Sequence, residues 1–244
     1  MYVYGRNILK EIIESDYKIK HIFFSDSKTE KGTLNEFVEL AKRKGYSYSF
    51  AHNDILEKMS LTNKHQGIVI DIGNEFSYQS LDILEDKENL FLVMLDQIHD
   101  PHNFGAIIRS SVAAGADAII IPKDNTVEVT PIVVKVSSGL VFKIPIIQVT
   151  NLSNTIELLK KWNVWVYGTD SVGIPYYEID FSGNVCLVYG NEGSGLRRNV
   201  KKHCDQLITI PMSNNVDSLN VSVSAGIILF EVKKQRDFLK KGIN

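Results

Sequence analysis

The stretch LDQIHDPHNFGAIIRSSVAAGA, residues 95–116, contains the features that decide the fold. An apolar run ends at its start, a polar segment follows, and a helical pattern comes next. One side of the predicted helix carries Phe104, Ile107, Ile108 and Ser111. Arg109 points away from that side. This order of elements predicts a strand that runs through a polar loop into a helix that packs on a sheet.

Similar short apolar runs recur from residue 90 onward, with helical segments between several of them. The runs are LFLVML (90–95), AIII (118–121), IPIIQV (144–149), VWVYG (164–168), VCLVYG (185–190) and LITIP (207–211). Continuous rather than alternating apolar runs are typical of strands buried on both faces, and alternation with helices favours a parallel sheet. We therefore predict a three-layer α/β domain over residues 89–244, with a ligand beyond the carboxyl ends of its strands.

The first part of the chain, residues 1–72, is predicted to be a separate small α/β domain. Its clearest segments are the helices GRNILKEIIES (5–15) and TLNEFVELAKRKG (33–45) and the strand QGIVIDI (66–72). We expect Thr33 to cap the second helix and Gly45 to end it. The polar and acidic stretch at 73–88 is predicted to be a linker between the two domains.

Composition and charge exclude several classes of protein. The chain has no run of about 18 apolar residues, so we expect no membrane span. A net charge of -2 means that any surface for nucleic acid would have to be local. Cys186 and Cys204 are too few for a disulfide framework and lack His or Cys neighbours at zinc spacing. We therefore expect a cytoplasmic protein with reduced thiols and no metal site.

The polar loop that precedes the predicted helix within residues 95–116 has two interpretations. Asn103 can cap the following helix through its side-chain oxygen, and Gly105 permits another backbone or a ligand to come close. In the simpler interpretation this is a capped surface helix with a solvated Arg109. In the other, the loop and Arg109 belong to a ligand site at the end of a strand. The residues alone leave both open.

A second polar loop, YGNEGSGLRRNV, occupies residues 189–200. Its glycines leave backbone N–H groups accessible to an anion or to a ribose. The GxxGxG spacing differs from the dinucleotide fingerprint, and the Lys-Ser/Thr pair of a phosphate-binding loop is missing. The alternative is that Glu192 caps the N–H groups of its own loop. Gly168 and Thr169 lie at a further strand end.

A third polar turn, over residues 210–220, leads into a helix that is apolar almost all round. In the simpler interpretation, Ser218 serves only as the N-cap of that helix. A helix with apolar residues on every side must be buried, either in a core or against a second subunit. The sequence therefore predicts an oligomer.

The segments NFGAIIR, LVYGNEGSGL and ITIPMSNNVDSLNVSVSAGI together resemble the three motifs of the SpoU (TrmH-like) branch of the SPOUT methyltransferases, in order and spacing. The resemblance covers the second domain almost from end to end. YGRNILKEII and KHQGIVI in the first domain resemble the substrate-binding domain often fused to this branch. The resemblance implies a deep trefoil knot near the carboxyl end, a homodimer, and methyl transfer from S-adenosylmethionine to a ribose 2′-hydroxyl, without a metal. It points to a guanosine of large-subunit (23S) ribosomal RNA.

Position by position, the resemblance also implies a site. Residues near the reaction would be Asn103, Arg109, Glu192, Ser218 and Asn220. Residues around the cofactor would be Gly168, Thr169, Gly190, Ile210, Met212 and Leu219. Candidates for RNA contacts are Arg6, Arg197 and Arg198, against the alternative of a solvated charged face.

Two questions stay open at this level. Arg109 is either a general base, which requires a very large fall of its pKa, or an anchor for phosphate and for the developing alkoxide. The rival functions are the same chemistry on transfer RNA, and a ribosome-assembly RNA-binding protein without catalysis. A dinucleotide-dependent oxidoreductase is disfavoured because no GxGxxG follows an early strand.

Overall fold

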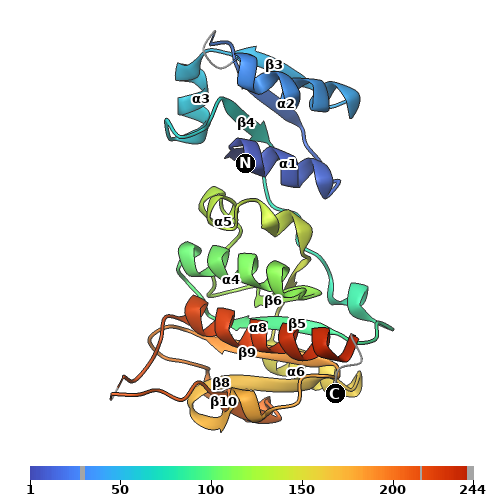
Figure 1. Ribbon diagram of the computed structural model, residues 1–244, viewed down its shortest axis with the longest axis vertical. Coiled ribbons are helices and arrows are strands. Elements are labelled where there is room, and N and C mark those ends of the chain that lie inside the picture. Colours follow the sequence, from blue (N-terminus) through green and yellow to red (C-terminus); the bar gives the residue numbers. More distant parts are fainter. Residues whose placement is uncertain (28–30, 215, 241–244) are drawn as a thin grey trace. The chain divides into compact units, whose positions relative to one another are not determined.

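The computed structural model describes residues 1–27, 31–214 and 216–240, which form two compact units (Figure 1). The first unit contains Met1–Ser77 together with Val129–Lys143. The second contains Tyr78–Glu128 and the chain from Ile144 onward. The domains expected from the sequence, 1–72 and 89–244, assign the segment 129–143 to the second domain, whereas here it packs with the first unit.

The first unit is built on a four-stranded mixed sheet in the order β1-β4-β2-β3. Its strands are β1 (Tyr2–Tyr4), β2 (His21–Ser25), β3 (Tyr48–Ala51) and β4 (Ile68–Asp71). Its helices are α1 (Arg6–Glu14), α2 (Lys31–Arg43), α3 (Asn53–Ser60), α5 (Pro131–Val136) and the 3₁₀ turn η2 (Leu140–Lys143). β2 pairs parallel with β3, and β4 pairs antiparallel with β1 and β2.

Segment 129–143 is tied to the first unit by ring packing and by an ion pair. The ring of Phe142 lies 4.8 Å from that of Tyr17, centroid to centroid. Lys143 Nζ lies 2.8 Å from Glu14 Oε2. Gly139 leaves no room for a side chain, because a Cβ there would lie 3.1 Å from Ile8 Cα on α1. The segment therefore covers apolar surface of α1 that would otherwise face water.

The second unit is built on a six-stranded sheet in the order β10-β8-β9-β5-β6-β7. The strands are β5 (Phe91–Asp96), β6 (Ala118–Pro122), β7 (Ile146–Val149), β8 (Trp165–Pro175), β9 (Val185–Gly190) and β10 (Gln206–Thr209). Every pairing between these strands is parallel, and every residue of β5 and β9 is buried. The prediction of a parallel sheet from continuous apolar runs is confirmed.

Helices cover both faces of this sheet (Figure 1). They are α4 (Pro101–Ala114), α6 (Leu152–Lys161), α7 (Arg198–His203) and α8 (Val221–Lys240), with the 3₁₀ turns η1 (Leu81–Leu84) and η3 (Tyr176–Glu178). Leu92 and Met94 of β5 pack in one cluster with α6 and α7. Phe91 points to the opposite face, where the Arg236 guanidinium of α8 lies 5.1 Å from its ring centroid. α8 also packs along α4.

Two predicted helix caps are wrong. Asp100, not Asn103, caps α4, with its side chain accepting the His102 N–H at 2.8 Å. Pro101 then occupies the first helical position, which suits a residue without an N–H. Thr33 lies inside the first turn of α2 rather than before it. Gly45 does follow the end of α2, at a φ of +73°, as expected of a helix-ending glycine.

The predicted orientation of α4 is confirmed, because Phe104, Ile107, Ile108 and Ser111 are buried and Arg109 is exposed. α8 is only partly covered in the single chain. Val223 is 49% exposed and Phe230 48% exposed. No helix within the described residues is long and apolar enough to cross a membrane. The deep trefoil knot stays a prediction.

Candidate active site

A pocket of about 700 Å³ lies at the carboxyl ends of β9 and β10 and beside the middle of β8. Its walls come from the middle of β8, the β9–α7 loop, the end of β10 with the chain after it, and the first turns of α8. The polar part of the lining includes Thr169, Asp170, Ser171, Ser218 and Ser224, and the apolar part includes Ile208, Ile210, Met212, Leu219 and Val221. A cavity of this size and mixed lining suits one small organic ligand.

The pocket gathers most residues expected around a cofactor. Thr169, Gly190, Ile210, Met212 and Leu219 line it, and so do Glu192 and Ser218 from the predicted reaction centre. Gly168 is not among the lining residues. A Cβ on Gly168 would lie 2.9 Å from both Cys204 Sγ and Leu196 Cδ1, so any larger residue there would force these side chains to shift. The roles of all these residues stay predictions.

A hydrogen-bonded chain of side chains connects three separate elements at the pocket rim. Asn103 Nδ2 on α4 donates to Glu192 Oε1 in the β9–α7 loop at 2.7 Å. Asn103 Oδ1 accepts from Asn220 Nδ2 at 3.0 Å. Asn103 is 8% exposed, so its amide needs these partners. These two hydrogen bonds fix the start of α4, the β9–α7 loop and the start of α8 relative to one another.

Asn220, not Ser218, caps α8. Its Oδ1 accepts the Ser222 N–H at 2.9 Å and the Ser222 hydroxyl at 2.6 Å. Its backbone carbonyl accepts the N–H groups of Val223 and Ser224. The suggestion that Ser218 is no more than an N-cap is therefore wrong, and Ser218 lines the pocket instead.

The glycine-rich loop does not offer the free backbone amides that its sequence suggests. Asn191 Oδ1 accepts the N–H groups of Gly193 and Ser194, and Asn191 O accepts that of Gly195. Gly190 is required for another reason, since a Cβ there would lie 2.3 Å from the carbonyl carbon of Gly195. The loop is a compact turn in which Asn191 accepts hydrogen bonds from the backbone N–H groups. Gly190 lets the backbone of Gly195 pass close to its own.

Arg109 lies on α4, the same helix as Asn103, and its side chain is exposed. It is not among the residues that line the pocket. Within one chain the structure therefore brings together Asn103, Glu192 and Asn220 by hydrogen bonds and adds Ser218 at the pocket.

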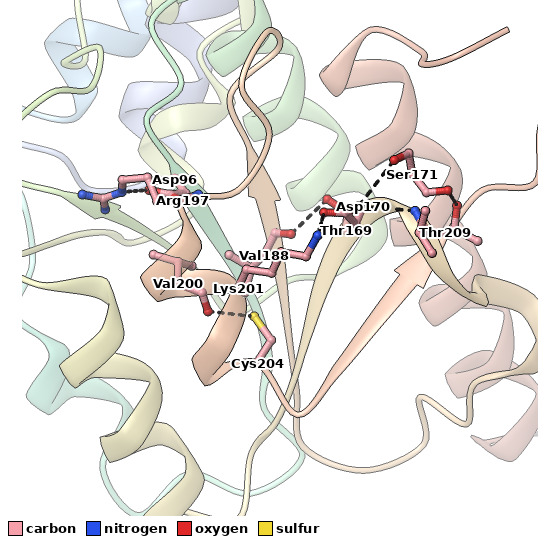
Figure 2. A network of polar contacts seen from close by, with 11 residues as sticks. Asp96, Thr169, Asp170, Ser171, Val188, Arg197, Val200, Lys201, Cys204 and Thr209 are labelled. Atoms are coloured by element: carbon pink, nitrogen blue, oxygen red, sulfur yellow. Dashed lines mark hydrogen bonds and ion pairs between the residues drawn. The ribbon is translucent and has the colours of Figure 1, made fainter.

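Asp96 is a buried acid that the sequence reasoning missed. It ends β5, is 0% exposed, and accepts hydrogen bonds from Arg197 N at 2.8 Å and Arg197 Nε at 2.6 Å (Figure 2). An acid at the end of an apolar run was the available signal. Arg197, a predicted RNA contact, thus uses its Nε inside the protein, while its side chain remains 43% exposed. Arg198 at the start of α7 is exposed.

Gly168 and Thr169 lie in the middle of β8, not at a strand end as the sequence suggested, because the strand continues to Pro175. This part of β8 is fixed to its neighbours by a second polar group (Figure 2). Thr169 Oγ1 donates to Val188 O at 3.0 Å, and Lys201 Nζ of α7 lies 2.7 Å from Asp170 Oδ2. Partial burial raises the pKa of Asp170, but the hydrogen bonds from Lys201 and Val172 and the charge of Lys201 outweigh it. The net result is a lowered pKa, which keeps this pocket carboxylate ionised.

The remaining reactive groups near the site are kept inert by burial. Burial raises the pKa of Cys204 to about 12 and that of the fully buried Cys186 further still. Burial also raises the pKa of Tyr189, whose hydroxyl has no hydrogen-bond partner among the described residues. Within the described parts of the chain, no group of three His, Cys, Asp or Glu residues is placed to hold a metal ion.

A strand-end pocket in a parallel α/β domain, with a polar network at its rim, is typical of α/β proteins that bind a small organic ligand. The chain belongs to the SpoU rRNA Methylase family, whose sequence model matches residues 90–230. A second model, RNA 2′-O ribose methyltransferase substrate binding, matches residues 2–75. The resemblance drawn from the motifs is thereby confirmed.

Individual relatives agree with the family. YacO of Bacillus subtilis, assigned to the TrmH family of tRNA/rRNA methyltransferases, is 39% identical over 97% of this chain and 96% of its own. The 23S rRNA (guanosine-2′-O-)-methyltransferase RlmB of Yersinia pestis is 38% identical over 96% of this chain and 97% of its own. The crystal structure of an AdoMet-bound rRNA methyltransferase from Sinorhizobium meliloti superposes with a TM-score of 0.79, at 26% identity, covering 96% of this chain and 86% of that one.

Proposed function

We propose that this protein transfers the methyl group of S-adenosylmethionine to a ribose 2′-hydroxyl of RNA, most specifically to a guanosine of 23S ribosomal RNA. The observation that carries the proposal is the strand-end pocket of about 700 Å³, bordered by Glu192 and its hydrogen bond to Asn103. The relatives named for 23S rRNA guanosine 2′-O-methylation align over nearly their whole length and support the substrate.

The pocket lining fits S-adenosylmethionine. Apolar side chains such as Ile210 and Leu219 suit the adenine, and hydroxyl groups such as those of Thr169 and Ser218 suit the ribose and the amino-acid end. When bound, this cofactor supplies a methyl group that its positive sulfonium already activates. The protein then has to align the acceptor hydroxyl with that methyl group and exclude water.

The residues near the rim have separate tasks in this proposal. Asn103 holds Glu192 and Asn220 in fixed positions, so that the acceptor ribose meets a preformed polar wall. Arg109 anchors a phosphate beside the target nucleotide and stabilises the developing negative charge on its 2′-oxygen. We favour this over a role as general base, because an arginine stays protonated under ordinary conditions.

Arg109 is the reason to propose a homodimer. It is not among the residues that line the pocket of its own chain, which supports the proposal that a second subunit presents it at a pocket. The partly exposed apolar residues Val223 and Phe230 of α8 offer a surface for that subunit. The cytoplasm is the compartment we propose, because the ribosomal substrate is made there.

RNA contacts are proposed for Arg6, Arg197 and Arg198. Arg198 is exposed at the start of α7, beside the loop that borders the pocket. Arg197 keeps N–H groups beyond the Nε that Asp96 holds, so it can serve both the protein and a phosphate.

The experiment is methyl transfer from labelled S-adenosylmethionine to unmodified total RNA, with the labelled nucleotide mapped by its resistance to alkaline cleavage. We expect one protected guanosine in 23S ribosomal RNA. Label in transfer RNA alone would keep the chemistry and overturn the substrate. Cofactor binding without label in any RNA would overturn catalysis and favour the RNA-binding assembly protein.

A further inference from the structure

Three basic residues from separate segments flank Gln66 and Gly5 in the first unit: Arg6 and Lys135 by contact, and Lys64 by its place two residues before Gln66. Arg6 begins α1, Lys64 lies in the loop before β4, and Lys135 belongs to α5. Only Arg6 was singled out by the sequence. Lys64 is exposed, and Arg6 and Lys135 are partly exposed, so all three remain accessible to a ligand.

The Arg6 guanidinium is held in place by the protein. Arg6 Nε donates to Gln66 O at 3.2 Å, and Arg6 Nη2 donates to Thr33 Oγ1 at 3.1 Å. Arg6 N donates to Gln66 Oε1 at 3.1 Å. These bonds use two of the five side-chain N–H groups of an arginine, which leaves the others for a ligand. A side chain fixed in this way loses little entropy when it binds an anion.

Lys135 is brought to the same place by α5. Its Nζ lies over the Tyr4 ring, 5.0 Å from the centroid. It also lies 3.5 Å from the point that a Cβ on Gly5 would occupy, and Gln66 Oε1 lies 3.1 Å from that point. The ammonium of Lys135 and the Gln66 side chain, which accepts from the Arg6 backbone amide, therefore both lie beside Gly5.

The cluster carries positive charge that the protein does not neutralise. Across the described residues, no carboxylate forms an ion pair with Arg6, Lys64 or Lys135. Burial lowers the pKa of Lys135, and the charge of Lys64 lowers it further. The first turn of α1 contains no acidic residue, so the positive end of that helix adds to the same potential. Like charges held together favour an anion between them.

We propose that Arg6, Lys64 and Lys135 form a binding site for a backbone phosphate of the substrate RNA. This inference rests on the proposed function, and it gives segment 129–143 a part in substrate binding. The site would read no base and would fix the position of the RNA on the first unit, as phosphate contacts generally do. The Tyr4 ring holds the Lys135 ammonium at the site through its face.

The test compares Lys64→Gln, Lys135→Met and the double variant with Lys58→Gln as the matched control. Lys58 is an exposed lysine of the same unit, on α3. Affinity for the RNA fragment that the wild type methylates is measured across a range of salt concentrations. Each single change at the site should reduce the salt slope by about 0.7, which at 0.1 M salt is about fivefold weaker binding. The control should match the wild type.

Kinetics separate this role from others. KM for RNA should rise with the loss of affinity, while kcat at saturating RNA and the Kd of S-adenosylmethionine should stay unchanged. Lys135→Arg should restore most of the affinity, because it restores the charge. Melting temperatures identify any variant that has lost its fold. If the wild type methylates RNA but the double variant keeps its RNA affinity and salt slope, the phosphate site is overturned and the proposed function stands.

Discussion

The side-chain amide of Asn103 donates a 2.7 Å hydrogen bond to Glu192, although 89 positions separate the two residues along the chain. The same amide accepts from Asn220. One buried asparagine thus sets the positions of both neighbours at the pocket rim.

Glu192→Ala is expected to lower kcat/KM about 10- to 100-fold, since a hydrogen bond to a charged group contributes about 1.5–3 kcal/mol. Glu192→Gln keeps an acceptor for Asn103 and should retain more activity. Methyl transfer to RNA measures both variants. Equal loss in the two would show that the charge of Glu192, rather than its hydrogen bond, is what matters.

Arg109→Ala should lose at least about 100-fold in kcat, because it removes a donor aimed at developing charge. The Kd of S-adenosylmethionine, measured by calorimetry, should not change, because the role proposed for Arg109 is a contact with the RNA phosphate and the 2′-oxygen rather than with the cofactor. Arg109→Lys tests the role, since an anchor tolerates another cation. Wild-type turnover by Arg109→Ala would contradict the assignment of this residue.

Gly190→Ala should abolish cofactor binding and lower the melting temperature strongly, because the new methyl group would lie 2.3 Å from the carbonyl carbon of Gly195. Gly193→Ala is the matched control in the same loop, where the nearest atom would be Asn191 Oδ1 at 3.6 Å. It should bind S-adenosylmethionine like the wild type. Similar damage in both variants would show that loop flexibility, not the close crossing, sets the requirement.

Arg197→Met should destabilise the protein more than Asp96→Asn. The first change leaves a buried carboxylate without its cation, at a cost of about 3 kcal/mol, whereas the second leaves an arginine that water can reach. Urea unfolding at neutral pH measures the free energies. The double variant should lose less than the sum of the single losses. Additive losses would mean that the two side chains do not act as a pair.

Lys201→Met should reduce stability at pH 7 by no more than about 1 kcal/mol, because the pair with Asp170 is partly exposed. The pKa of Asp170 is lowered in the folded state, so its stabilisation is present above the ordinary value of 3.8 and is lost as the pH falls through the folded value. The difference between variant and wild type should therefore disappear in acid. Urea unfolding at several pH values measures it, and a difference that persists at low pH would contradict the pairing.

The strands of the second unit could be predicted because burial on both faces leaves a direct mark, a continuous apolar run such as that of β5. The pocket residues at strand ends followed from the same pattern and from the family motifs. The caps could not be ranked in advance, since Asp100 and Asn103 are both good capping residues and only the position of Pro101 decides between them.

Contacts between residues far apart in the sequence could not be predicted from a local pattern of this kind. Asp96 and Arg197 are 101 positions apart, and nothing in the local sequence couples an acid at a strand end to one arginine among several. The use of the loop amides by Asn191 also depends on the turn that the chain adopts, not on the spacing of its glycines.

The return of Val129–Lys143 to the first unit means that the chain passes between the units at three points, after Ser77, after Glu128 and after Lys143. Neither unit can therefore be separated from the other by dividing the chain at a single point. In a chimaera that replaces only the residues before this first point with the RNA-binding domain of another protein, segment 129–143 would pack against a surface that it does not match. Exchange of substrate range between such enzymes would require two grafts, made together.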